Sequence, residues 1–209
     1  MFFALSQYYI RKFRPQWKAF LTRLVYSSRN VKIGRNFTTD SVPRILVDPE
    51  ASLEIGDNVE FRRNLEIRVH GKAKVKIEDN VRIDRGVRIL AANKAEIVIG
   101  KGTRIGLYTV LNGGDSIKTG EKVLVSGFVY LQTSMHGFAS KSLSVQDQGY
   151  DHAPVELKDD VWLGTHVVIM PGVTLGKGAV VGSNAVVTKS VDDYTVVAGI
   201  PAKPIKQRE

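Results

Sequence analysis

The sequence of 209 residues contains no cysteine. This absence excludes a disulfide framework, a thiolate metal site and a cysteine nucleophile, and it is typical of proteins in a reducing compartment. No run of about twenty apolar residues is present, so a membrane-spanning helix is not expected. The first cations follow the apolar start instead of preceding it, which is unlike a secretory signal peptide. We therefore expect a cytoplasmic protein.

Acidic residues are missing from the first 39 positions, which hold eight lysines and arginines. Because the whole chain has a net charge of +9, the remaining residues contribute only +1. The body of the protein thus lacks the basic face of a nucleic-acid-binding domain, and no nucleic-acid partner is expected.

Residues 2–25 repeat large apolar side chains at near-helical spacing, with cations between them. This pattern predicts one or two amphipathic helices, with an interruption at Pro15 because proline lacks an amide donor. Such a segment can cap the end of a larger domain. It can also lie on the inner face of an anionic membrane through residues 1–28. The sequence leaves both open.

An aliphatic residue returns at every sixth position through much of the chain. The clearest series is Leu157, Leu163, Ile169, Leu175, Val181 and Val187. Six residues can form a short strand and a corner, and three such sides close a triangular coil that is stable only when several coils stack. The pattern predicts an all-β solenoid over residues 46–187, after a basic helical lead-in at 1–45 and before a tail at 188–209.

The repeat disappears between Met135 and Val155, where the sequence is polar and mixed. A long loop inside a regular repeat protein usually has a function. We therefore expect an excursion loop over residues 136–154.

Three segments carry a family resemblance: DVWLGTHVVIMPGVTLG at 160–176, AVVTK at 185–189 and GIPAK at 199–203. They strongly resemble the hexapeptide-repeat acyltransferases, and most closely the sugar and polysaccharide O-acetyltransferases. The resemblance implies a left-handed parallel β-helix, a homotrimer, acetyl-CoA bound in the groove between adjacent subunits, and a glycan acceptor. It implies no metal.

The catalytic histidine of that family stands just before the long loop, a position that His136 holds here. A neutral imidazole can take the proton of a sugar hydroxyl as the oxygen attacks the thioester. The resemblance assigns cofactor contacts to Trp162, Gly164, Thr165, Ser183, Thr188, Lys189, Lys203 and Lys206. The expected acceptor contacts are Tyr108, in the coil before the histidine, and Asp151 and His152 in the excursion loop.

The acceptor is less defined than the donor. Maltose and galactoside transferases carry an acceptor-binding asparagine that is missing from the aligned residues 105–109. Together with the basic aromatic N-terminus, this departure favours a surface polysaccharide or lipid-linked glycan. The alternatives are N-acetylation of a nucleotide-linked amino sugar and a non-catalytic scaffold. A metal-dependent carbonic anhydrase of the same fold needs three histidine ligands, two of them closely spaced, which the sequence does not offer.

Overall fold

The computed structural model describes Ser6 and residues 8–209, so residues 2–5 and 7 of the expected helix lie outside the described residues. A π-helical turn, η1 (Tyr9–Phe13), leads directly into helix α2 (Arg14–Tyr26). Pro15 lies in the first turn of α2, where a missing amide hydrogen costs nothing, so it marks the junction between the two segments. In this described part of the chain, no helix is both long and apolar enough to cross a membrane.

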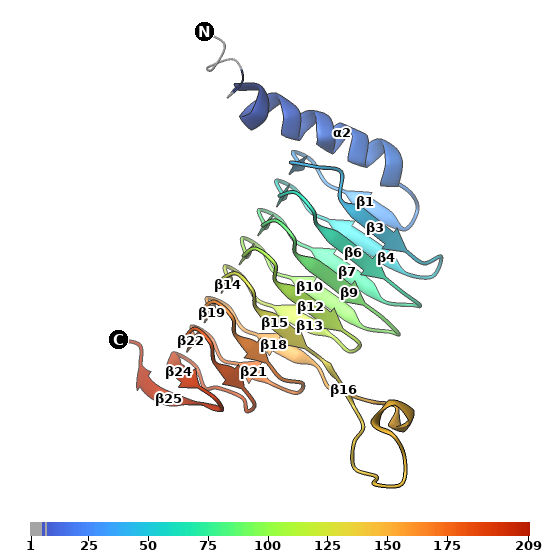
Figure 1. Ribbon diagram of the computed structural model, residues 1–209. Helices are drawn as coiled ribbons and strands as arrows, with labels where there is room; N and C mark the ends of the chain where they lie inside the picture. Colours follow the sequence, from blue (N-terminus) through green and yellow to red (C-terminus); the bar gives the residue numbers. More distant parts are fainter. Residues whose placement is uncertain (1–5, 7) are drawn as a thin grey trace.

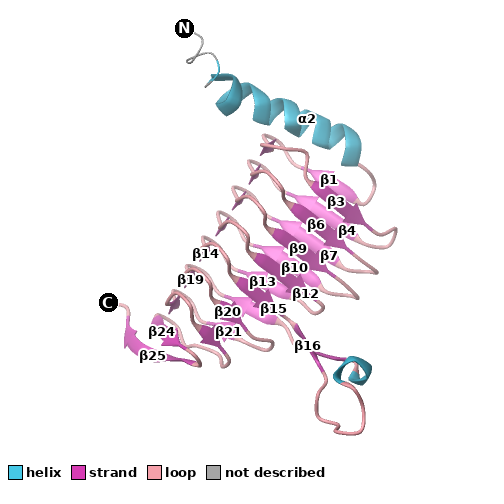
Figure 2. Cartoon of the chain, viewed as in Figure 1, coloured by secondary structure: helices cyan, strands magenta, loops and turns pink. Residues whose placement is uncertain are grey.

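The strands wind into a three-sided parallel stack (Figures 1 and 2). Sheet A contains β1 (Val31–Ile33), β4 (Ser52–Ile55), β7 (Lys74–Ile77), β10 (Glu96–Ile99), β13 (Ile117–Thr119), β18 (Val155–Leu157) and β21 (Thr174–Leu175). Sheet B contains β2 (Thr38–Thr39), β5 (Glu60–Phe61), β8 (Arg82–Ile83), β11 (Arg104–Ile105), β14 (Leu124–Val125), β19 (Trp162–Leu163), β22 (Val180–Val181), β24 (Thr195–Gly199) and β25 (Ala202–Gln207). Sheet C contains β3 (Arg44–Val47), β6 (Glu66–Val69), β9 (Arg88–Ala91), β12 (Val110–Gly113), β15 (Tyr130–Gln132), β20 (Val168–Ile169) and β23 (Val186–Val187).

The length of a coil changes along the stack. Leu53 pairs with Val75, which pairs in turn with Ile97, so each coil at the N-terminal end takes 22 residues. The C-terminal coils take eighteen, as the pairing of Leu157 with Leu175 shows. The sixfold spacing therefore holds strictly only near the C-terminus. The longer coils gain their extra residues from the four-residue strands of sheets A and C.

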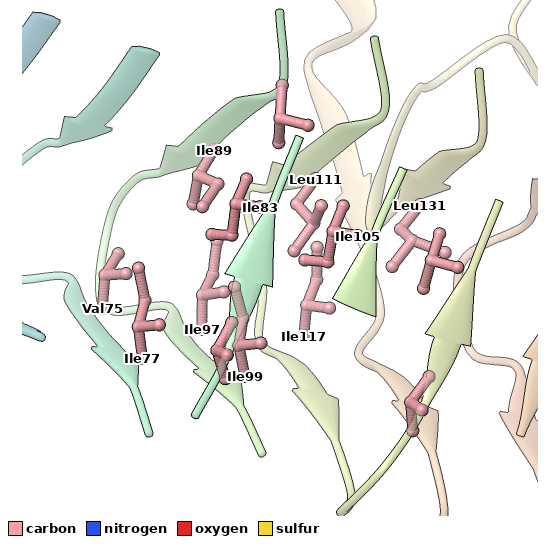
Figure 3. Packing of buried hydrophobic residues seen from close by; sticks show 14 of the residues in the cluster. Val75, Ile77, Ile83, Ile89, Ile97, Ile99, Ile105, Leu111, Ile117 and Leu131 are labelled. Atoms are coloured by element: carbon pink, nitrogen blue, oxygen red, sulfur yellow. The ribbon is translucent and has the colours of Figure 1, made fainter. Parts of the chain in front are cut away.

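Aliphatic side chains fill the inside of the triangle. Val75, Ile97 and Ile117 stack in neighbouring coils of sheet A and are at most 1% exposed (Figure 3). Corner residues take left-handed backbone angles, and Asn36, Asn58 and Asn80 form such a column, in which each amide donates to the next. Asparagine tolerates this conformation better than most residues.

The stack extends beyond the predicted boundaries at both ends. Strand β1 pairs in parallel with β4, so the first coil begins inside the segment 1–45. Its aliphatic spacing is hidden because Thr39 takes an inward position beside Phe61 and Pro43 occupies a buried corner. At the other end, β24 and β25 continue sheet B within the segment 188–209, with β25 antiparallel to β24.

Candidate functional site

The excursion leaves the stack between sheet C and sheet A, and its base is a two-stranded antiparallel hairpin. Strand β16 (Ser134–His136) pairs with β17 (Tyr150–His152), and a short 3-10 helix, η2 (Val145–Gln148), lies between them. Figure 1 shows this hairpin projecting from the side of the stack. The excursion is thus anchored by strand pairing at the point where its predicted catalytic residue lies.

His136 is exposed at the end of β16, directly across from Tyr150. The two ring centroids are 4.2 Å apart and the rings are tilted by 38°. Within residues 8–209 the imidazole has no hydrogen-bond partner, so both ring nitrogens are open to a substrate. Tyr150 was not predicted from the sequence. Only the register of the hairpin reveals the contact.

His152 lies on the same face of the hairpin as His136, because His136 pairs directly with Tyr150 and alternate residues of a strand, such as Tyr150 and His152, share a face. Its Nδ1 is 2.9 Å from the Oγ of Ser134, and its ring stacks on Tyr150 with a centroid distance of 6.1 Å. Asp151, by contrast, pairs with Met135 on the opposite face. The two predicted acceptor residues of this hairpin therefore point in different directions.

Beside the hairpin, His152 lines a groove of about 660 Å³ on neighbouring coils. Lys72, Lys94 and Asp115 also line this groove. Lys72 forms an ion pair with Glu50 at 3.1 Å. Charged side chains thus lie on the walls of this groove, which also includes His152 from the ring cluster of His136, Tyr150 and His152.

A second group of predicted residues lies on sheet B and on the corner between sheets B and C. Trp162 is 47% exposed on β19, and its indole N–H donates to the Oγ of Ser126 at 3.4 Å. Thr165 follows at the corner, where its Oγ1 donates to the carbonyl oxygen of Gly127 at 2.9 Å. Ser183 occupies the same corner in the next coil.

Gly164 allows two coils to approach closely. A Cβ at this position would lie 2.6 Å from the backbone nitrogen of Ser183, which is too short for any side chain. The Gly164 amide already donates to the carbonyl of Val181 at 2.8 Å. In the described chain, the neighbouring amide of Thr165 has no acceptor, so Thr165 rather than Gly164 offers a free backbone donor beside Trp162.

Tyr108 belongs to a row of three rings on the corner between sheets B and C. Its ring stacks on Phe128 at 5.4 Å, and Phe128 stacks on His166 at 4.8 Å and 2°. All three residues have positive φ, between 53° and 60°. Bulky residues rarely adopt this conformation, and such outliers often mark functional sites. Of these three residues, only Tyr108 was predicted from the sequence.

The predicted lysines and Thr188 divide between the two groups. Thr188 and Lys189 follow β23 and are exposed on the corner between sheets C and A, the corner from which the excursion departs. Lys203 and Lys206 are exposed on β25 at the edge of sheet B. Lys203 pairs with Ala198 and Lys206 with Val196.

One chain does not bring all these residues together. The excursion with His136, Tyr150 and His152 departs from the corner between sheets C and A, after β15 and before β18. Thr165 and Tyr108 lie on the corner between sheets B and C, and Trp162 lies on sheet B beyond that corner. Sheet C therefore separates the two groups. Among the described residues, no three histidine, aspartate or glutamate side chains gather as a metal site.

Several known proteins resemble parts of this chain. Residues 154–189 match the family described as bacterial transferase hexapeptide (six repeats). The chain is 35% identical over 105 residues to the probable acetyltransferase Rv3034c of Mycobacterium tuberculosis, covering 50% of this chain and 35% of that protein. It is 33% identical over 100 residues to the putative lipopolysaccharide biosynthesis O-acetyl transferase WbbJ of Escherichia coli, covering 44% and 51%. The matched segments therefore span about half or less of these relatives.

Among solved structures, the chain resembles a point mutant of AntD, an N-acyltransferase from Bacillus cereus in complex with dTDP-4-amino-4,6-dideoxyglucose and coenzyme A. The TM-score is 0.62 at 24% identity, covering 85% of this chain and 84% of that one. The predicted left-handed parallel β-helix and the resemblance to the hexapeptide-repeat acyltransferases are thereby confirmed.

Proposed function

Because the C-terminal coils carry the hexapeptide repeat of the bacterial transferases, we propose that the chain is an acetyl-CoA-dependent acyltransferase. Its acceptor is a sugar hydroxyl of a surface polysaccharide or lipid-linked glycan, and His136 is the general base. The observation that carries the proposal is the hairpin at the base of the excursion, which presents an unpaired imidazole against the ring of Tyr150. The similarity to WbbJ supports a glycan acceptor.

The separation of the two groups of residues supports a homotrimer. Sheet C lies between the corner that carries His136 and the corner that carries Thr165. If sheet C faces the neighbouring subunits, the His136 corner of one chain meets the Thr165 corner of the next. Two half-sites then form one complete site at each subunit boundary.

The reaction needs a base and an oxyanion donor. The neutral imidazole of His136 takes the hydroxyl proton as the sugar oxygen attacks the thioester carbonyl, and such a base contributes about 10²–10⁴-fold in rate. The free amide of Thr165 is placed to stabilise the resulting oxyanion. Collapse of the tetrahedral intermediate breaks the carbon–sulfur bond. The imidazolium then returns its proton to the departing thiolate of coenzyme A.

The donor is bound along the second group of residues. Trp162, Thr165 and Ser183 line a continuous strip across two coils, along which an extended pantetheine arm can lie. Lys203 and Lys206 continue this strip at the edge of sheet B, where ammonium groups can bind the phosphates of coenzyme A. Thr188 and Lys189 lie on the other corner, so they contribute to the same donor through the neighbouring subunit.

The acceptor is bound between the two half-sites. Tyr108 and Phe128 are each about half exposed, and the accessible edges of their stacked rings offer contacts for a sugar ring. The groove beside His152 holds Lys72 and Lys94, which favours a glycan that carries a phosphate or another acidic group.

The test measures release of coenzyme A from acetyl-CoA with a panel of neutral, acidic and lipid-linked glycans. We expect coenzyme A release to depend on the acceptor, and we expect its rate to fall by at least about 100-fold in His136→Ala. Glu54→Gln is the control, because Glu54 is exposed on β4, in an early coil away from the proposed groove. Full turnover by His136→Ala would overturn its role as base. Release with amino sugars alone would assign N-acetylation instead, and no release with any acceptor would favour the scaffold.

A further inference from the structure

The outer face of η1 and helix α2 together carries a continuous apolar stripe that no described residue covers. Tyr9, Phe13, Trp17, Phe20 and Leu24 follow one another at intervals of three or four residues, and each is between 49% and 71% exposed. The rings of Tyr9 and Phe13 stack at 5.7 Å, and those of Trp17 and Phe20 stack at 5.6 Å. An apolar patch of this kind on a water-facing helix usually marks an interaction site.

The stripe points away from the β-helix. Ala19 and Thr22 are buried, and the Arg23 guanidinium donates to the carbonyl of Gly34 in the first coil. At 3.6 residues per turn, Ala19 lies about 200° around the helix axis from Trp17. Figure 2 shows α2 lying across the end of the stack. The capping contact thus uses one face of α2 and leaves the aromatic face free.

The charge around the stripe indicates the chemistry of its partner. Residues 1–39 hold eight cations and no acid, and on the helix Arg14 is exposed and Lys18 is half-buried. A second copy of this chain would bring an equally basic segment against the first, and like charges oppose that pairing. A surface with negative headgroups above an apolar interior satisfies both the cations and the rings.

We propose that the outer face of α2 docks this protein on an anionic lipid bilayer. The aromatic stripe enters the boundary between headgroups and acyl chains, and the flanking cations contact the headgroups. At about 1.5 Å per residue, the thirteen residues of α2 span about 20 Å of membrane surface. The predicted transferase residues lie on later coils, so docking leaves them in the aqueous phase. This inference does not depend on the proposed transfer reaction.

Co-sedimentation of the full chain with vesicles tests the proposal. Phosphatidylcholine vesicles with about 30% phosphatidylserine are compared with pure phosphatidylcholine at about 0.1 M salt. The stripe variant is Trp17→Gln/Leu24→Gln. Its matched control is Ile200→Gln/Ile205→Gln, since these two side chains are similarly exposed at the opposite end of the stack.

We expect the wild type to bind anionic vesicles, the stripe variant to bind about tenfold or more weakly, and the control to bind as the wild type does. Thermal melting checks that the stripe variant keeps the fold. Failure of the wild type to bind anionic vesicles would overturn the proposal, as would equal binding by the stripe variant. A stripe-dependent change in solution mass without vesicle binding would assign the face to a second copy instead.

Fluorescence gives a second readout. In a Trp162→Phe background, Trp17 is the single tryptophan of the chain. Its emission should shift to the blue on addition of anionic vesicles, because the indole leaves water. An unchanged spectrum in the presence of bound vesicles would show that the stripe is not the docking face.

Discussion

The ring of Tyr150 lies 4.2 Å from the ring of His136, across one rung of the hairpin at the base of the excursion. A catalytic imidazole must be held in one orientation, and in many enzymes a carboxylate or carbonyl does this by a hydrogen bond. No described residue makes such a bond to His136. The ring of Tyr150 contacts this imidazole instead, so we expect Tyr150 to act as a positioning residue for the proposed base.

Replacement of Tyr150 separates the effect of its ring from that of its hydroxyl. We expect Tyr150→Phe to keep most activity, since the ring contact survives. Tyr150→Ala should lower kcat about tenfold while the KM for acetyl-CoA stays close to that of the wild type, because the base loses its orientation. Steady-state kinetics with both substrates varied provides the measurement. Equal losses in the two variants would instead point to a role for the hydroxyl.

The contribution of Gly164 is steric, and this can be measured through stability. A Cβ at position 164 would lie 2.6 Å from the backbone nitrogen of Ser183. We expect Gly164→Ala to lower the free energy of unfolding by about 1–3 kcal/mol, because the two coils must move apart. Adding Ser183→Ala should not restore stability, since the nearest atom belongs to the backbone. Denaturant unfolding of the wild type and the two variants is the check, and recovery in the double variant would contradict the explanation.

The fold could be predicted from the sequence because each coil needs aliphatic residues at the same inward positions. An inward aliphatic such as Leu163 stacks on its counterpart Val181 one coil away, and this spacing appears directly in the sequence. The first coil escaped detection because Thr39 and Pro43 take buried positions there. Its existence depends on pairing with the next coil, which composition alone does not reveal.

The candidate site could be predicted only in part. His136 and Trp162 were identified through a motif, but their placement at different sides of the coil depends on the order of the sheets. Tyr150 and Phe128 escaped notice because their contacts come from the hairpin register and from corner stacking across coils. Neither relationship has a fixed spacing in the sequence.

A cluster of charges on sheet C predicts a dependence of stability on pH. Glu66 accepts hydrogen bonds from Arg68 at 2.7 Å and from Arg88 at 2.8 Å. Partial burial acts to raise the pKa of Glu66, but the two arginines outweigh it and the pKa is lowered. Glu66 therefore stabilises the fold above the pKa of the unfolded chain, about 4.3. This contribution is lost as the pH falls through the lower pKa of the folded state.

We expect Glu66→Gln to lower Tm at pH 7 and to flatten the decline of Tm on acidification below about pH 4.3. Glu121→Gln, at an exposed corner, is the matched control and should change neither quantity. Thermal melting from about pH 3 to about pH 7 provides the comparison. A parallel pH profile in Glu66→Gln and wild type would show that the arginine contacts do not contribute to stability.

The row of rings on the corner between sheets B and C predicts a conflict between stability and function. Phe128 holds a φ of 60°, a conformation that asparagine tolerates better, and Asn64 and Asn184 occupy the same corner in other coils. We expect Phe128→Asn to preserve or raise Tm, because it relieves the backbone. The same change removes the ring between Tyr108 and His166, so the KM for the glycan should rise about tenfold with little change in the KM for acetyl-CoA. Phe128→Tyr is the control that keeps the ring. A glycan KM that stays at its wild-type value in Phe128→Asn would exclude the row from acceptor binding, whereas a loss of stability would show that stacking outweighs backbone strain.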